Sequence, residues 1–258
     1  MKFLTILSLL SLMVVVANAK IHTEVVEYKH GDANLEGYLA YDDAVTAKRP
    51  GVLIIHEWTG IGDYVKMRAE ELARMGYVAF ALDMYGKGIR PQNAQEAAAQ
   101  AKIYRDDRNL MRARANAGLK VLINQKPVDP SKIAAIGYCF GGGAVLELAR
   151  SGADIAGVVS FHGNLDTPNP EDAKKIKAKV LICHGGADPH VPRQQVEAFE
   201  DEMQNAGVDW QMNVYGGAVH SFTNPASGND LSTGVAYNEK ADKRSWQAMK
   251  DFFAEIFK

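Results

Sequence analysis

The chain has 258 residues, of which 47% are hydrophobic and 23% charged, a composition typical of folded globular proteins and unlike that of disordered or collagen-like chains. Twenty-nine basic and 31 acidic residues give a formal net charge of −2 without a long run of either sign. This distribution argues against a surface that follows a nucleic acid backbone, so we expect no nucleic acid partner.

The first 19 residues differ from the rest of the chain. Residues 3–17 are almost entirely apolar, follow Lys2, and lead into Asn18 and Ala19. A basic start, a short apolar segment and small residues at its end are typical of a secretory signal peptide, and this segment is short for a membrane span. We expect cleavage after Ala19, a secreted or periplasmic protein, and no stable membrane association after cleavage. The alternative is an uncleaved N-terminal anchor.

Residues 20–258 are expected to form a single domain. Two alternating stretches, 21–29 and 35–41, flank turn-forming residues at 30–34 and predict an antiparallel hairpin. Short and fully apolar runs follow, as is typical of parallel strands that are covered on both faces. These runs are residues 52–55, 78–82, 133–136, 157–161 and 180–183.

Amphipathic helices are predicted between these runs. Val65, Ala69, Leu72 and Met75 recur at helical spacing and stop at Gly76. Similar patterns precede positions 127 and 207, and another closes the chain at 246–256. The alternation of strands and helices favours an α/β fold. Residues 84–108, long, polar and rich in Ala, are interpreted as a helical excursion over the carboxyl edge of the sheet, where such folds bind ligands.

The sequence around Cys139 is the most informative for function. An apolar run leads into Gly137, Tyr138, Cys139, Phe140 and Gly141, and a helical pattern follows. This is the nucleophile elbow arrangement, with Cys in place of the more usual Ser. The following helix favours the thiolate, and the Phe140 amide is free to bind an oxyanion. The alternative is a Gly-rich turn with an inert buried cysteine.

Two further strand ends supply an acid and a base. Asp188 follows the run 180–183, and His220 follows a stretch of strand character at 208–215. Nucleophile, acid and histidine then occur in the chain order that α/β-hydrolases use. We predict that Cys139 attacks an acyl carbon, that His220 moves protons, and that Asp188 orients the imidazole. His184, His190 and Asp166 are the competing assignments.

The first buried strand ends in His56, Glu57 and Trp58. We predict that the Trp58 amide is a second oxyanion donor, because the loop after this strand supplies that donor in the fold. A carboxylate such as Glu57 at the end of an apolar strand must find partners or stay protonated to higher pH. We therefore predict that Glu57 acts on the nucleophile, the alternative being an ordinary surface acid.

Together these residues resemble the dienelactone hydrolase family of α/β-hydrolases. The resemblance covers residues 21–258 and rests on Glu57, the Gly-x-Cys-x-Gly elbow, the loop that carries Asp188, and the His-Ser-Phe sequence that starts at His220. It implies an α/β-hydrolase fold with a mostly parallel eight-stranded sheet and helices on both faces. It further implies a Cys139, Asp188 and His220 triad, with Glu57 in contact with the sulfur.

The same resemblance bears on the cysteines and on the substrate. The chain has two cysteines, Cys139 and Cys183. On sequence alone they form either one disulfide or two thiols. In the implied sheet one strand separates them, beyond the reach of a disulfide, so the resemblance favours two free thiols. Dienelactone-cleaving members hold the substrate carboxylate with arginines at positions that this chain fills differently. The candidate substrate contacts are Tyr85, Lys87, Arg90 and Phe222, while Asn224 offers no charge.

The sequence predicts a hydrolase of small esters or lactones that needs no cofactor. A thioesterase or peptidase on the same scaffold, and a catalytically silent binding protein, are the alternatives. His184, Asp188 and His190 are interpreted as a turn that presents Asp188, so we expect no metal. We expect a monomer or a weak homodimer.

Overall fold

The structure is a computed structural model that describes residues 20–258. The predicted signal peptide, residues 1–19, lies outside the described residues. Within residues 20–258, no helix combines the length and the apolar character needed to cross a bilayer.

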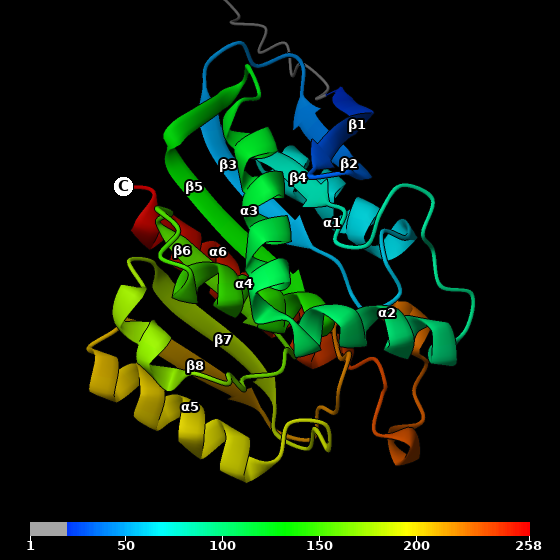
Figure 1. The fold of residues 1–258 in the computed structure, drawn as a ribbon, viewed down its shortest axis with the longest axis vertical. Helices are drawn as coiled ribbons and strands as arrows, with labels where there is room; N and C mark the ends of the chain where they lie inside the picture. Colours follow the sequence, from blue (N-terminus) through cyan, green and yellow to red (C-terminus); the bar gives the residue numbers. More distant parts are fainter. Residues whose placement is uncertain (1–19) are drawn as a thin grey trace, which may run out of the picture.

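Eight strands of the described chain form one sheet in the order β1-β2-β4-β3-β5-β6-β7-β8 (Figure 1). Strands β3 to β8 are parallel, whereas β2 is antiparallel to both of its neighbours, β1 and β4. The predicted fold class, with its N-terminal hairpin, is confirmed. The strands are β1 Ile21–His30, β2 Ala33–Asp42, β3 Arg49–Ile55, β4 Val78–Leu82, β5 Val128–Tyr138, β6 Gly157–Phe161, β7 Lys179–Gly185 and β8 Trp210–Tyr215.

Helices cover both faces of the sheet, each over its own apolar core (Figure 1). One core receives side chains from α2, α3, α4 and α5, and the other from α1 and α6. The α-helices are α1 Asp63–Arg74, α2 Ala94–Asp106, α3 Arg108–Ile123, α4 Phe140–Arg150, α5 Arg193–Ala206 and α6 Glu239–Ile256. Short 3-10 helices are η1 Pro170–Lys175, η2 Pro225–Ser227 and η3 Leu231–Thr233.

The elements follow the predicted pattern but differ at their ends. Strands β1 and β2 extend further than predicted, so the turn between them consists of Gly31 and Asp32 alone, and Gly31 takes the φ of +58° that glycine tolerates best. The predicted helical excursion is α2. It begins where the Asn93 side chain accepts a hydrogen bond from the Glu96 amide. Tyr104 of α2 packs against Phe140, which brings this helix to the elbow.

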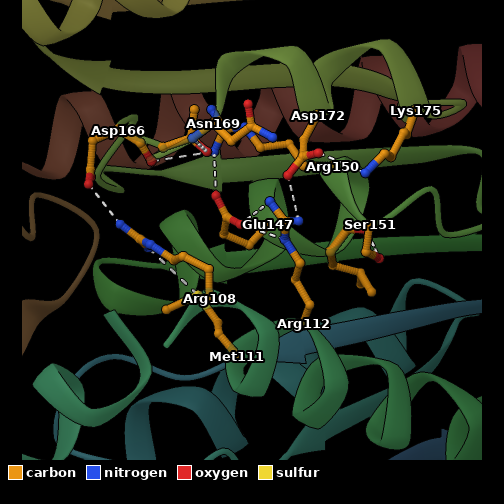
Figure 2. Close-up of polar contacts among 12 residues, drawn as sticks. Arg108, Met111, Arg112, Glu147, Arg150, Ser151, Asp166, Asn169, Asp172 and Lys175 are labelled. Carbon is orange, nitrogen blue, oxygen red and sulfur yellow. Dashed lines mark hydrogen bonds and ion pairs between the residues drawn. The ribbon is translucent and has the colours of Figure 1, made fainter. Parts of the chain in front are cut away.

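A buried ion-pair cluster joins four helical elements on the face covered by α4 (Figure 2). Arg150 of α4 has no exposed surface and pairs with Glu147 of the same helix and with Glu202 of α5. Arg112 of α3 bridges Glu147 and Asp172 of η1. The cluster therefore fixes α4, the helix that follows Cys139, to its neighbours.

The strand order also decides the state of the cysteines. Strand β6 lies between β5, which ends before Cys139, and β7, which contains Cys183. Both cysteines are buried and free, which confirms the predicted pair of thiols.

Candidate active site

Cys139 lies on a strained turn between β5 and α4. Its φ of 54° and ψ of −116° are rare for any residue other than glycine. The glycines on either side make the turn possible, because a Cβ on Gly137 would lie 2.0 Å from the Gly141 carbonyl oxygen and one on Gly141 would lie 2.1 Å from that of Ile55. The chain thus turns through a space that admits no side chain, and the sulfur is left at the edge of the sheet.

The N-terminus of α4 faces the Cys139 sulfur. Cys139 is the residue that caps this helix, and unpaired amides at a helix N-terminus stabilise a negative charge. Among residues 20–258 neither the Phe140 amide nor the Trp58 amide donates a hydrogen bond. Both predicted oxyanion donors are therefore free to bind an oxygen atom.

The structure brings Cys139, His220 and Asp188 together. His220 Nε2 lies 3.1 Å from Cys139 Sγ, and His220 Nδ1 lies 2.8 Å from Asp188 Oδ2. The other Asp188 oxygen accepts a hydrogen bond from the His190 amide at 2.8 Å. Asp188 therefore has both oxygens engaged, and it holds the imidazole with Nε2 toward the sulfur.

The charge state of His220 depends on its two neighbours. Burial lowers the pKa of His220, but the Cys139 sulfur and the Asp188 carboxylate outweigh burial and raise that pKa to about 10. An imidazolium beside the sulfur favours the thiolate, which is the nucleophilic form of cysteine. The site is thus arranged to hold a pair of opposite charges.

Among the described residues, none of the competing side chains forms a hydrogen bond with the Cys139 sulfur, which contacts His220. Asp166 forms an ion pair with Arg108 at 2.7 Å. His184 is buried beneath the Asp188 loop, where desolvation lowers its pKa. The centre of the His190 ring lies 5.1 Å from that of the His220 ring. The His190 side chain lines a small cavity that opens at the Cys139 sulfur.

Glu57 is held by the segment that carries His220. Its Oε1 accepts a hydrogen bond from Ser221 Oγ and its Oε2 accepts one from Asn224 Nδ2, each at 2.7 Å. Burial raises the pKa of Glu57, and these two hydrogen bonds oppose that rise. Among the described residues no hydrogen bond joins Glu57 to Cys139, and both Glu57 oxygens instead bind the loop of His220.

Comparison with known proteins agrees with this geometry. Residues 35–257 match the sequence profile of the dienelactone hydrolase family. The chain belongs to the dienelactone hydrolase family. It is accordingly a hydrolase of the dienelactone hydrolase type.

Relatives within and around the family differ in their described activities. A solved structure of a dienelactone hydrolase-like promiscuous phosphotriesterase from metagenomic libraries is 40% identical, with a TM-score of 0.88, and the match covers 93% of this chain and 99% of that one. A probable 2-oxo-3-(5-oxofuran-2-ylidene)propanoate lactonase of Bradyrhizobium sp is 28% identical over 73% of this chain and 80% of the relative. A putative carboxymethylenebutenolidase of Saccharolobus solfataricus is 26% identical over 90% of this chain and 98% of the relative.

A small cavity opens at the Cys139 sulfur of this family member. Its volume is about 170 Å³, and Cys139, His220 and Ser221 line it together with Trp58, His190 and Val235. Larger hollows, such as the one between η1 and α5, contain none of these residues. The lining has more apolar than polar character and contains no Lys or Arg.

None of the four predicted substrate contacts lines this cavity. Phe222 has no exposed surface and belongs to the apolar core. Lys87 and Arg90 form ion pairs with Glu27 and Glu36 on the N-terminal hairpin.

Tyr85, the fourth of these contacts, is buried and supports an oxyanion donor. Its hydroxyl donates a hydrogen bond to the Trp58 carbonyl oxygen at 2.8 Å. Tyr85 therefore holds the backbone of a predicted oxyanion donor and does not face the cavity.

Four residues of the site escaped the sequence analysis as contributors. Ser221, Thr223 and Asn224 follow His220 directly, and His162 follows β6. Position relative to a strand end was the available signal, since His162 directly follows the strand beside the elbow. Their partners lie more than 20 residues away in sequence, so hydrogen bonds that only the fold creates define their roles.

Within residues 20–258, no group of three or more His, Cys, Asp or Glu side chains is arranged to bind a metal ion.

Proposed function

We propose that this protein is an exported hydrolase of small esters or lactones that works through a cysteinyl acyl-enzyme. The observation that carries the proposal is the position of His220, with Nε2 3.1 Å from Cys139 Sγ and Nδ1 2.8 Å from Asp188. A nucleophile, a base and an orienting acid in hydrogen-bond contact are the parts that nucleophilic acyl transfer requires.

In the first half of the reaction the Cys139 thiolate attacks the carbonyl carbon and forms a C–S bond. The carbonyl oxygen becomes an oxyanion, which the Trp58 and Phe140 amides stabilise by hydrogen bonds. The C–O bond then breaks, and the His220 imidazolium gives its proton to the departing alkoxide. With a lactone that alcohol remains attached to the acyl group, so ring opening releases nothing at this stage.

In the second half water cleaves the thioester. Once the sulfur is acylated it has lost its charge, so the main cause of the raised His220 pKa is gone and the neutral imidazole acts as a base. His220 takes a proton from water, the oxygen attacks the acyl carbon, and the C–S bond breaks. The carboxylic acid leaves, and the thiolate and imidazolium are restored.

The cavity indicates the kind of acyl group. A dry cavity of about 150 Å³ accommodates benzene, so about 170 Å³ suits an acyl group of comparable size. The lining contains no Lys or Arg side chain, and one of its residues, Ser221, donates a hydrogen bond to the Glu57 carboxylate. We infer that neutral acyl groups are preferred to those that carry a second carboxylate.

A second candidate activity is phosphotriester hydrolysis. It is favoured by the 40% identity to the promiscuous phosphotriesterase, over nearly the whole of both chains. A phosphoryl oxygen would use the same two amides; the sulfur would form an S–P bond as the P–O bond to the leaving group breaks, and water activated by His220 would then cleave the S–P bond and release the phosphodiester. Comparing kcat/KM for a neutral ester and for paraoxon in one preparation tests which activity dominates.

Intact mass spectrometry tests the acyl-enzyme directly. The protein is mixed with a panel of esters, lactones, thioesters and peptides, and the acyl mass that remains on the chain is located by peptide mapping. We expect an ester- or lactone-derived acyl group on Cys139, loss of both label and turnover in Cys139→Ala, and neither loss in Cys183→Ala. Turnover that survives Cys139→Ala contradicts the proposal. Thioester- or peptide-derived labels alone support the alternative hydrolases, and binding without any label supports a silent protein.

Export is tested on the protein expressed from the full sequence. N-terminal sequencing of material from the periplasm or medium is expected to begin at Lys20. A chain that retains residues 1–19 and sediments with membranes contradicts cleavage and supports the N-terminal anchor.

A further inference from the structure

His162 is a buried histidine that the proposed reaction does not use. It directly follows β6, the strand beside the elbow, and is 1% exposed. Its backbone has a φ of 41°, which is uncommon for a residue other than glycine. Two residues with positive φ, Cys139 and His162, therefore follow directly after the adjacent strands β5 and β6.

The His162 side chain contacts the backbone of the nucleophile. The Cys139 amide donates to the Phe161 carbonyl oxygen at 3.0 Å, as the sheet ladder requires, and also to His162 Nδ1 at 3.1 Å. The second acceptor lies outside the ladder. It holds the Cys139 peptide plane at the point where the chain leaves the strand for its strained turn.

The contact with the Cys139 amide fixes the tautomer of the ring. Because Nδ1 accepts a hydrogen bond, the proton must be on Nε2, which lies 2.7 Å from Thr223 Oγ1. Burial and the charge of His220 lower the pKa of His162 well below its usual value. The ring is therefore neutral, with one acceptor and one donor, and both are used.

Thr223 belongs to the segment that carries the base. His220 contacts the sulfur, Ser221 and Asn224 hold Glu57, and Thr223 accepts from His162. The His162 ring thus joins the backbone of the nucleophile to the loop of the base.

The far side of Thr223 is also anchored. Its Oγ1 lies 2.6 Å from the Tyr64 hydroxyl, and its carbonyl oxygen accepts from Arg68 at 3.0 Å. Arg68 is itself buried and paired with Asp242 of α6. The loop of the base is therefore fixed to α1 and α6 as well as to the elbow.

We propose that His162 is a positioning residue that sets the separation of Cys139 Sγ and His220 Nε2 by bonding the Cys139 amide and Thr223 at once. The inference rests on the proposed function for its catalytic consequence. The positioning role itself can be tested without a substrate, because a chemical probe measures the reactivity of the Cys139 thiol.

Thr223→Val and Thr223→Ser form the matched test. Valine has nearly the shape of threonine but no hydroxyl, so His162 Nε2 and the Tyr64 hydroxyl both lose this partner, whereas serine keeps it. We expect Thr223→Val to lower kcat for a neutral ester roughly 3- to 15-fold, the rate equivalent of one hydrogen bond. We expect KM to stay within twofold, and Thr223→Ser to restore kcat to within twofold of the wild type.

Two further measurements separate positioning from folding. The rate of Cys139 alkylation by iodoacetamide at pH 7 in the native protein is expected to fall with kcat in Thr223→Val and to recover in Thr223→Ser. The second measurement uses His162→Asn, because asparagine tolerates the left-handed backbone but does not reach Thr223. Adding Thr223→Val to this variant is expected to lower the alkylation rate and kcat by less than a further twofold.

Several results overturn the inference. The inference fails if Thr223→Val keeps both its alkylation rate and its kcat within twofold of the wild type. It also fails if the losses of kcat caused by Thr223→Val and His162→Asn are fully additive in the double variant. If Thr223→Val does not fold, alkylation of His162→Asn decides alone, and a wild-type rate there overturns the proposal. If the wild type hydrolyses nothing, the proposed function fails, but the alkylation measurements still judge His162.

Discussion

Cys139 Sγ and His220 Nε2 are 3.1 Å apart, although 81 residues separate them in sequence. The pair is largely closed to water, since the two residues are each 7% exposed. Opposite charges interact more strongly in such a site than at the surface. The raised pKa of His220 therefore favours an imidazolium beside the sulfur in the resting protein.

The charge pair predicts how alkylation of Cys139 depends on pH. The pKa of His220 is raised to about 10, so an imidazolium persists beside the sulfur through neutral pH. We expect iodoacetamide to react with Cys139 at a nearly constant rate from pH 6.5 to 8.5. His220→Asn removes the positive charge, and alkylation should then rise with pH as for an ordinary thiol, whose pKa is about 8.5. A steep rise in the wild type contradicts the charge pair.

Asp188 is predicted to be essential because it fixes the imidazole tautomer. Asp188→Asn keeps the side-chain shape but offers an amide in place of a carboxylate oxygen, and kcat is expected to fall roughly 10²- to 10⁴-fold. The control is Asp166→Asn, since Asp166 was the competing acid in the sequence and is paired with Arg108. Asp166→Asn should keep kcat within twofold of the wild type. A larger loss of kcat in Asp166→Asn than in Asp188→Asn would assign the orienting role to Asp166.

A cavity lining without Lys or Arg predicts a preference between two esters of similar size. The wild type is expected to hydrolyse p-nitrophenyl butyrate with a higher kcat/KM than p-nitrophenyl hemisuccinate, which carries a carboxylate. Val235 is half-buried at the cavity, so Val235→Lys places a cation there. The relative kcat/KM for the hemisuccinate should then rise roughly 3- to 10-fold.

The control for that prediction is Val235→Met, which adds length without charge. It should leave the ratio of the two esters unchanged. A wild type that favours the hemisuccinate shows that an anion site exists that the cavity lining does not contain.

Arg150 is predicted to be the most costly member of the buried cluster to remove. Arg150→Ala leaves Glu147 and Glu202 without their shared cation in a site with almost no solvent, and removing one partner of a buried ion pair costs roughly 3 to 5 kcal/mol. Urea unfolding measures the free energy of unfolding. Lys174→Ala breaks an exposed pair with Glu171 and should cost about 1 kcal/mol at most. Equal losses in both variants contradict the prediction.

The sequence by itself determined the class of the fold and the order of the reactive groups. Apolar runs of strand length between helical patterns define an α/β sheet, because a parallel strand is buried on both faces. The glycines around Cys139 predicted the elbow, since no side chain fits where the Gly137 and Gly141 backbones pass. The apolar runs and the glycine positions are local patterns, and local patterns can be recognised in a single sequence.

Tertiary structure alone decided which side chains meet. The charges of Lys87 and Arg90 suggested substrate contacts, yet the hairpin supplies Glu27 and Glu36 and takes both away from the cavity. The sequence did not distinguish His162 from any other histidine after a strand. Its role depends on the pairing of β6 with β5 and on the contact of its ring with Thr223. Such partners are far apart in sequence, and hydrogen bonds and ion pairs act only over a few ångströms. Their roles therefore exist only after the chain has folded.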